Sequence, residues 1–227
     1  MIIVPDNQSF TEHTYFLPPS KVSDSIILAG PALEISFLRQ IFDLQTAILN
    51  IQAQTPTNNR SIQLADVCLK PINSSNRNCL IFSVSQYFQN MPENLNKTVA
   101  DEVFGLIYAD YLSHISVCSN KPDFAYDSEL NMSCNATFGS LIKPSLIFAG
   151  NETSDLATGA RALAITIFLE NSNDAEMWEK ACWLYVQNFT DTQTLLRAQH
   201  RWNETANFKI FFANEHFFKR ELNYMTW

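Results

Sequence analysis

A helical repeat of apolar side chains between residues 31 and 54 is the clearest pattern in the chain. Apolar residues recur there at alternating intervals of four and three, which predicts a long amphipathic helix ending near Gln54. Pro31 suits the first helical position, where its missing N–H costs nothing. The apolar positions of the repeat are Phe37, Ile41, Leu44, Ile48 and Ile51.

A second helix is predicted from Ala175 to about Asn188, with Asp174 as its N-cap. Four bulky or sulfur-bearing side chains share one face of it at helical spacing. They are Trp178, Cys182, Tyr185 and Phe189.

Four short apolar runs predict β-strands. The run Arg161–Leu169 is apolar on both faces, which is typical of a central strand. The runs are Ile2–Val4, Leu146–Phe148, Arg161–Leu169 and Phe208–Phe212.

The order of these elements indicates the fold class. Strand, helix, strand and then strand, helix, strand is the split βαβ pattern, so we predict an α+β, ferredoxin-like core. Its sheet would be antiparallel, with both helices on one face. Residues from about 55 to 150 would form a large insertion into this core, and residues 1–227 a single domain.

Three stretches lack a steady period. Residues 5–30 predict a long irregular excursion in which Ile26–Leu28 tuck into the core, whereas prolines stiffen Phe16–Ser20 into a loop that displays its apolar side chains. Val103–Ile107 fits an exposed tip and the start of a strand equally well. Tyr108–Cys118 fits either an extended segment or a helix.

The five cysteines divide into two close pairs and a remainder. Cys68 and Cys79 stand at the feet of a polar loop, and Cys118 and Cys134 bracket another. A disulfide across a loop as short as the first stabilises by roughly 2–3 kcal/mol, in an oxidising compartment. Four of five cysteines can pair in fifteen ways, so local pairing is one hypothesis among several. Cys182 is then a buried, inert thiol.

Charge and motifs exclude several classes of protein. With 15 basic and 23 acidic residues, the chain has a net charge of −8 and no basic stripe of the kind that nucleic-acid binding requires. It lacks nucleophile-elbow, metalloprotease, P-loop and dinucleotide motifs, and it has no Cys-x-x-Cys pair for zinc. No apolar run approaches the roughly 18 residues that span a bilayer. We therefore expect no enzymatic activity, no cofactor and no metal.

The sequence contains nine Asn-x-Ser/Thr sequons, where roughly three are expected by chance. This number predicts a heavily N-glycosylated luminal or extracellular domain. The chain opens without the basic and apolar regions of a signal peptide, so we expect it to be a piece of a longer secretory or membrane protein. The sequons begin at Asn7, Asn59, Asn73, Asn96, Asn131, Asn135, Asn151, Asn188 and Asn203.

Several stretches, in their order and spacing, resemble the middle luminal domain of the Niemann–Pick type C sterol transporter family, and Patched-type proteins share its architecture more loosely. The resemblance implies a domain looped out between two transmembrane helices. It would face the lumen of late endosomes and lysosomes, or the outside of the plasma membrane. It also implies the disulfides Cys68–Cys79 and Cys118–Cys134. The matching stretches include LADVCLKP, SVSQYFQN, IYADYLSHISVC, TFGSLIKPSLIFAG, ALAITIFLEN and MWEKACWLYV.

Domains of this family bind the small soluble Niemann–Pick type C sterol carrier through two protruding loops, which implies two partner-binding loops here. Pro18 stands where familiar members carry an aromatic residue, and Gly105 and Leu106 stand where they carry a pair. Two expectations follow: partner recognition differs in this protein, or it runs through Phe16 and Phe104 instead. The first loop is Phe16, Leu17, Pro18, Pro19, Ser20 and Lys21, and the second is Val103, Phe104, Gly105 and Leu106.

The rest of the same transporter chain is a second expected partner, and a pathogen glycoprotein that exploits the same loops is a third. Two other functions compete with carrier docking. The 17 phenylalanines could line a lipid pocket in a Patched-like luminal domain. A glycosylated hydrolase is the remaining alternative, although no nucleophile–base pair is recognisable.

Overall fold

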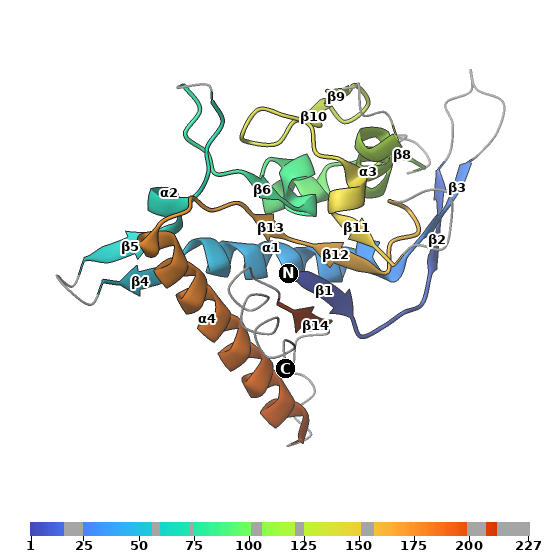
Figure 1. Ribbon diagram of the computed structural model, residues 1–227. Helices are drawn as coiled ribbons and strands as arrows, with labels where there is room; N and C mark the ends of the chain where they lie inside the picture. Colours follow the sequence, from blue (N-terminus) through green and yellow to red (C-terminus); the bar gives the residue numbers. More distant parts are fainter. Residues whose placement is uncertain are drawn as a thin grey trace, which may run out of the picture.

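The computed structural model describes residues 1–15, 25–55, 60–72, 75–100, 106–120, 125–150, 157–198 and 208–212. Four of its strands make a central antiparallel sheet, and the others form two-stranded pairs (Figure 1). The helices are α1 (Ile35–Leu49), α2 (Leu64–Val67), α3 (Tyr111–Asn120) and α4 (Asn173–Ala198), and the 3-10 helices are η1 (Pro31–Leu33), η2 (Val84–Phe88), η3 (Pro92–Asn96) and η4 (Pro144–Leu146).

The central sheet has the strand order β11–β12–β1–β14, and every neighbouring pair is antiparallel. With α1 after β1 and α4 after β12, this is the split βαβ arrangement, in which each helix joins two parallel strands separated by a third. The predicted α+β class and antiparallel sheet are confirmed. The strands are β1 (Ile2–Pro5), β11 (Phe148–Ala149), β12 (Ala162–Ala164) and β14 (Phe208–Phe211).

Both long helices pack on one face of this sheet. The ring of Phe208 on β14 lies 6.0 Å from Phe37 of α1 and 5.7 Å from Phe189 of α4, measured between ring centroids. Ile3 and Leu163 are opposite each other in the register and fully buried. Ile2 and Phe211 on the other face are 45% and 58% exposed. The alternating strand pleat thus directs one apolar row at the helices.

The elements between α1 and β11 extend the molecule away from the central sheet (Figure 1). They remain in contact with it, because Tyr87 and Phe88 of η2 are fully buried and Tyr87 stacks on Phe148 of β11 at 6.2 Å. The strands of this region are β4 (Gln52–Gln54), β5 (Ser61–Gln63), β6 (Ile81–Phe82), β7 (Val99–Ala100), β8 (Ile107–Ala109), β9 (Tyr126–Asp127) and β10 (Met132–Ser133).

The first predicted helix is shorter than its periodicity suggests. Glu34 interrupts it with an extended backbone, and the Glu34 carboxylate accepts a hydrogen bond from the N–H of Phe37 at 3.0 Å. At the other end the Asn50 side chain donates to the carbonyl oxygen of Thr46, a local bond that competes with helix continuation. Residues 52–54 consequently belong to β4 and not to the helix.

The predicted central strand 161–169 is also divided. Its first part is β12, whereas β13 (Thr166–Ile167) leaves the sheet and pairs with β6. The chain turns at Ile165, whose N–H donates to the carbonyl oxygen of Met1 at 2.9 Å. The following helix, α4, runs about ten residues beyond the predicted end at Asn188.

The excursion over residues 5–30 contains an antiparallel hairpin, β2 (Thr11–Tyr15) and β3 (Ser25–Ala29). The prediction that Ile26–Leu28 tuck into the core is wrong, because Ile26 and Leu28 are 67% and 50% exposed. Side chains alternate between the faces of a strand, so only Ile27 turns toward the body of the molecule. Tyr108–Cys118, left open by the sequence, enters helix α3.

None of the helices in the described parts of the chain combines the length and apolar character required to cross a bilayer.

Replacing Gly30 with alanine is expected to lower the free energy of unfolding by about 1–3 kcal/mol, the usual cost of overpacking. A Cβ at this position would collide with the carbonyl oxygen of Ala160 and lie 2.8 Å from its nitrogen. Chemical denaturation measures the loss. Gly139→Ala is a comparison for backbone strain alone, since its Cβ would meet nothing closer than 3.4 Å but its φ of 86° disfavours alanine, so it should lose stability without moving a neighbour. Equal stability of Gly30→Ala and the parent chain would contradict the close approach.

Candidate docking surface at two adjacent hairpins

The strands of the first hairpin flank the first predicted loop in the sequence. β2 and β3 pair from Thr11 opposite Ala29 to Tyr15 opposite Ser25. The predicted loop residues Phe16 to Lys21 join these strands and lie outside the described residues. The structure therefore defines the base of this loop.

The strands of a second hairpin, β7 and β8, flank the second predicted loop in the sequence. β7 pairs with β8 antiparallel, with an irregularity in register between Val99 and Ala100. Val103, Phe104 and Gly105 lie outside the described residues. Leu106 directly precedes β8 and is half-buried.

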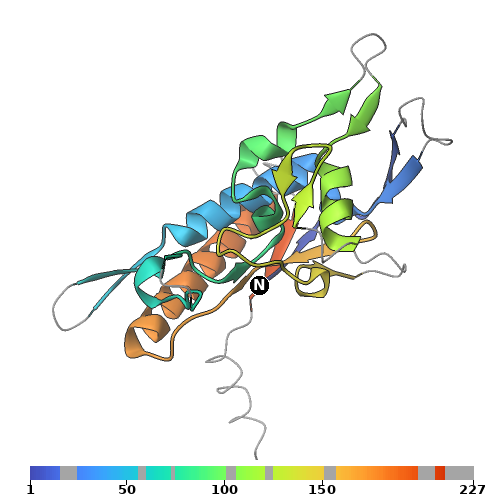
Figure 2. The same ribbon diagram turned by 90° about the horizontal axis from the view of Figure 1, so that it is seen from above.

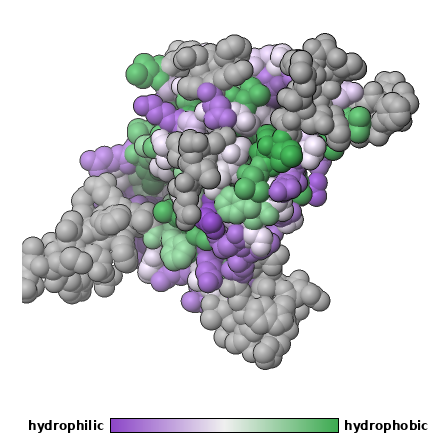
Figure 3. Space-filling view, turned by 90° about the vertical axis from the view of Figure 1, so that its right-hand side faces the viewer, coloured by the Kyte–Doolittle hydropathy of each residue, from purple (hydrophilic) through white to green (hydrophobic). Residues whose placement is uncertain are grey.

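The two hairpins are far apart in sequence but adjacent in space. Strand β2 of the first contacts strand β8 of the second. Seen from above, both hairpins project from the same side of the molecule, the first in blue and the second in green (Figure 2). This side carries apolar side chains among hydrophilic ones (Figure 3). Ile26, Leu28 and Ile107 are its exposed large apolar residues on the strands, with Ile107 39% exposed.

A buried hydrogen bond joins the loop end of the first hairpin to the base of the second. The Tyr15 hydroxyl, at the end of β2, donates to Oδ1 of Asp110 at 2.6 Å, and Asp110 directly follows β8. The two residues are only 4% and 8% exposed. Burial, followed by the hydrogen bond to Asp110 and the charge of its carboxylate, raises the pKa of Tyr15 far above its ordinary value. The hydroxyl consequently stays protonated as a donor at any physiological pH.

Asp110 is also the N-cap of α3. Its Oδ1 accepts from the backbone N–H groups of Leu112 and Ser113 at 2.9 and 3.2 Å. Ser113 reciprocates, because its Oγ accepts from the N–H of Asp110 at 2.9 Å. The rings of His13 and Tyr111, the first residue of α3, are nearly perpendicular, with their centroids 6.4 Å apart. Strand β2, the end of β8 and α3 therefore share one anchoring point.

Helix α3 is fixed in turn by a buried histidine. Nδ1 of His114 lies 2.8 Å from Oδ2 of Asp127, and Nε2 lies 2.8 Å from the carbonyl oxygen of Tyr87. A carbonyl oxygen can only accept a hydrogen bond, so Nε2 carries a proton and donates it to Tyr87. The hydrogen bond between Nδ1 and the Asp127 carboxyl group contains a second proton. His114 is fully buried and Asp127 is 2% exposed. The pair links η2, α3 and β9.

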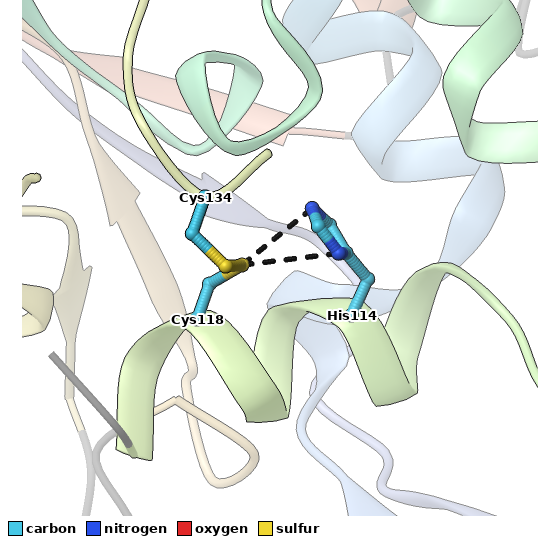
Figure 4. A group of neighbouring side chains, drawn as sticks. All are labelled: His114, Cys118 and Cys134. Carbon is cyan, nitrogen blue, oxygen red and sulfur yellow. Dashed lines mark hydrogen bonds between the residues drawn. A yellow bond between two sulfur atoms is a disulfide. The ribbon is translucent and has the colours of Figure 1, made fainter. Parts of the chain in front are cut away.

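His114 also lies beside a disulfide, with Cys118 Sγ 3.6 Å from its Nε2 (Figure 4). Potential metal-ligand atoms of His114, Cys118 and Cys134 lie within 4.8 Å of one another. They do not fit a metal ion, because both sulfur atoms are used in the disulfide and both ring nitrogens in hydrogen bonds. The cluster is a structural anchor for α3.

Both disulfides implied by the family resemblance are confirmed. Cys68 bonds Cys79, and Cys118 bonds Cys134. Cys182 is a free, buried thiol, and burial raises its pKa to about 12. Such a thiol is not ionised at physiological pH and is a poor nucleophile.

The sequons divide by exposure. Asn135 is half-buried, and four others are exposed in the structure: Asn7, Asn96, Asn131 and Asn188. The remaining four, Asn59, Asn73, Asn151 and Asn203, lie outside the described residues. Exposure is compatible with a glycan at four positions, and glycosylation itself stays a prediction.

An aromatic groove lies between α1, α4 and β14, elements that belong to neither hairpin. Its volume is about 320 Å³. It is lined by Gln40, Asp43, Leu44, Ala47, Tyr185, Phe189 and Phe208.

Acid is expected to weaken the His114–Asp127 anchor below about pH 4. Burial alone raises the pKa of Asp127, but the hydrogen bond from His114, the backbone N–H of Leu130 and the histidine charge outweigh it and lower the pKa overall. A carboxyl whose pKa is lower in the folded than in the unfolded chain contributes its full stabilisation of the folded state at pH values above its unfolded-state pKa of about 3.9. This stabilisation is lost as the pH falls through the folded-state pKa.

Denaturation curves between about pH 6 and pH 2 measure this loss. The parent chain should lose more stability over that range than Asp127→Asn, whose side chain does not titrate. Parallel curves for the two proteins would contradict the assignment.

Sequence reasoning missed the residues that build the shared base. Asp110 followed by Ser113 is a capping pattern, and His114 and Cys118 have the spacing of one helix face. Both signals lie in the stretch that the sequence left open between helix and extended structure. Nothing local links Tyr15 with Asp110, which are 95 residues apart.

A family model described as NPC1, middle luminal domain, matches residues 1–215. NPC intracellular cholesterol transporter 1 from Sus scrofa is 36% identical over 197 residues, which cover 83% of this chain and 15% of that protein. NPC1-like intracellular cholesterol transporter 1 from Rattus norvegicus is 29% identical over 219 residues, covering 89% of this chain and 16% of that protein. A Caenorhabditis elegans NPC1 homologue is 29% identical over 171 residues, covering 67% of this chain and 12% of that protein.

Proposed function

The chain belongs to the family of the NPC1 middle luminal domain, and from this premise we propose that it is the part of a sterol transporter that receives a soluble sterol carrier. The carrier would be of the Niemann–Pick type C kind. It would bind the loops at the tips of the two hairpins and pass its sterol to another part of the transporter. The chain spans about one sixth of the length of the curated relatives it matches, so this role concerns one segment of a larger protein.

The observation that carries this proposal is the adjacency of the hairpins. Two loops separated by more than 80 residues adjoin strands that contact each other, β2 and β8, and Tyr15 at the end of β2 bonds Asp110 after β8. Two loops on one rigid base can contact one partner together, and aromatic groups on rigid loops are typical interface anchors. The sequence supplies Phe16 in the first loop and Phe104 in the second.

The proposed setting is the luminal side of late endosomes and lysosomes, or the outer face of the plasma membrane. Two disulfides fit an oxidising compartment of origin. The sequons agree with passage through the secretory pathway.

A lipid-binding role is the second candidate, and the groove between α1 and α4 is the observation that favours it. Its aromatic lining and volume of about 320 Å³ suit part of a sterol. The groove is on the helical face of the sheet, remote from the two loops in sequence and formed by different elements.

Two binding assays on the glycosylated chain separate the candidates. Immobilised chain is incubated with sterol-loaded or empty carrier, and separately with labelled sterol alone. Capture of the loaded carrier without retention of free sterol supports the receptor. The opposite result has two parts: the chain captures no carrier, and it retains free sterol that the groove-filling variant Leu44→Trp does not retain. That result would contradict the receptor and support the lipid-binding function.

A further inference from the structure

The hydrogen bond between Tyr15 and Asp110 connects the two hairpins directly. We propose that it is the positioning contact that locks the two hairpins into one unit, so that both loops meet a partner at a fixed spacing. The consequence for carrier affinity rests on the proposed function. The locking itself is a property of this chain alone.

The bond connects the loop end of the first hairpin with the base of the second. Tyr15 is the last residue of β2 and immediately precedes the first loop, while Asp110 follows the last residue of β8. A change at Tyr15 acts next to the first loop, and a change at Asp110 acts at the base of the second hairpin. Because the two residues touch, a change at one also acts on the other hairpin.

Burial makes this bond stronger than a surface contact. With exposures of 4% and 8%, neither group has free access to water. A charged acceptor and a short distance of 2.6 Å mark the stronger class of hydrogen bond. Loss of the hydroxyl leaves a buried carboxylate one donor short, which favours movement of the hairpins apart until water reaches Oδ1.

The remaining contacts of Asp110 connect the two hairpins to a well-anchored helix, which would make the pair of hairpins rigid. Oδ1 also accepts from Leu112 and Ser113 in the first turn of α3. That helix is held through His114 to Tyr87 and Asp127, and through Cys118 to Cys134. The Tyr15 hydroxyl therefore ties the first hairpin to the best-anchored helix near the second.

Hydrogen exchange on the 227-residue chain tests the lock without any partner. Tyr15→Phe removes only the hydroxyl, whereas Asp110→Ala removes the acceptor oxygen of the bond together with the N-cap of α3. Tyr126→Phe is the matched control, since Tyr126 is 49% exposed and its hydroxyl bonds a neighbouring loop residue, Asn131. Deuterium uptake is followed in peptides that cover β2–β3 and β7–β8.

The lock predicts faster exchange in both hairpins for each single variant, and no additional change in the double variant, because the two residues make one bond. Tyr126→Phe should leave both hairpins unchanged. Faster exchange confined to β2–β3 in Tyr15→Phe would overturn the proposal, and so would fully additive effects in the double variant.

Binding kinetics with the sterol carrier test the consequence. Unlocked hairpins have the correct spacing only part of the time, so Tyr15→Phe should reduce the association rate by about tenfold and leave the dissociation rate nearly unchanged. General destabilisation would not alter the association rate of a chain that is still folded. An unchanged association rate overturns the positioning role. If the parent chain binds no carrier, the proposed function fails, and the exchange experiment alone decides the lock.

Discussion

Replacing Phe16 and Phe104 together with alanine is expected to abolish binding of the sterol carrier, with a loss of at least about 100-fold in affinity. Each loop presents one aromatic residue, and truncating an aromatic anchor commonly costs about 2 kcal/mol or more. We expect the midpoint of thermal unfolding to stay unchanged, since both residues are proposed to act in binding and not in folding. Calorimetric titration and thermal denaturation measure the two effects.

Ile72→Ala is the matched control for this double variant. Ile72 is a fully exposed apolar residue on the loop closed by Cys68 and Cys79, which is separate from both hairpins. The Ile72→Ala variant should bind carrier like the parent chain. Undiminished binding by a folded Phe16→Ala, Phe104→Ala protein would contradict the assignment of the two loops. Weaker binding by Ile72→Ala would instead indicate that the carrier contacts the loop closed by Cys68 and Cys79.

His114→Ala is expected to lower the free energy of unfolding by about 3–5 kcal/mol, the largest effect on stability that we predict. The change leaves the buried Asp127 carboxylate without its side-chain partner and the carbonyl oxygen of Tyr87 without its donor. It also removes a ring that packs against Phe88 at 5.3 Å. Chemical denaturation at neutral pH measures the loss.

His13→Ala is the control, because His13 is only partly buried and its described polar contact is with the exposed Thr11. If His114→Ala does not fold, His114→Gln, which can still donate to one acceptor, should recover part of the stability. A loss below about 1 kcal/mol in His114→Ala, the value of a surface contact, would contradict the anchoring role.

The sequence predicts the central fold well, because its evidence is local. Three strands of the sheet overlap their predicted apolar runs, and the repeat that begins at Phe37 has one helical face. The predicted strand Leu146–Phe148 is displaced, because Leu146 ends the 3-10 helix η4 and β11 begins at Phe148. The boundaries are less predictable. Glu34 stops the helix by bonding the N–H of Phe37, and Ile165 breaks a strand by bonding Met1, which is 164 residues away. The second bond is a tertiary effect that no window of the sequence contains.

The docking surface is harder to predict for the same reason. Hydropathy alone favoured burial of Ile26–Leu28, but a two-stranded hairpin has one face toward solvent, where Ile26 and Leu28 lie. Both loops were predicted by family resemblance, and neither the contact between β2 and β8 nor the Tyr15–Asp110 bond follows from residue spacing. These contacts depend on how the segment between α1 and β11 packs against the sheet.

Titration of the glycosylated chain with sterol-loaded and empty carrier, at about pH 5.5 and pH 7.4, tests the receptor function most directly. Our account predicts saturable binding that favours the loaded carrier. Absence of binding by either form at both pH values, from a chain whose cooperative unfolding shows that it is folded, would contradict it. Pro18 and Gly105 would then mark the loss of this partner, and a lipid-binding or Patched-like role would become the better hypothesis.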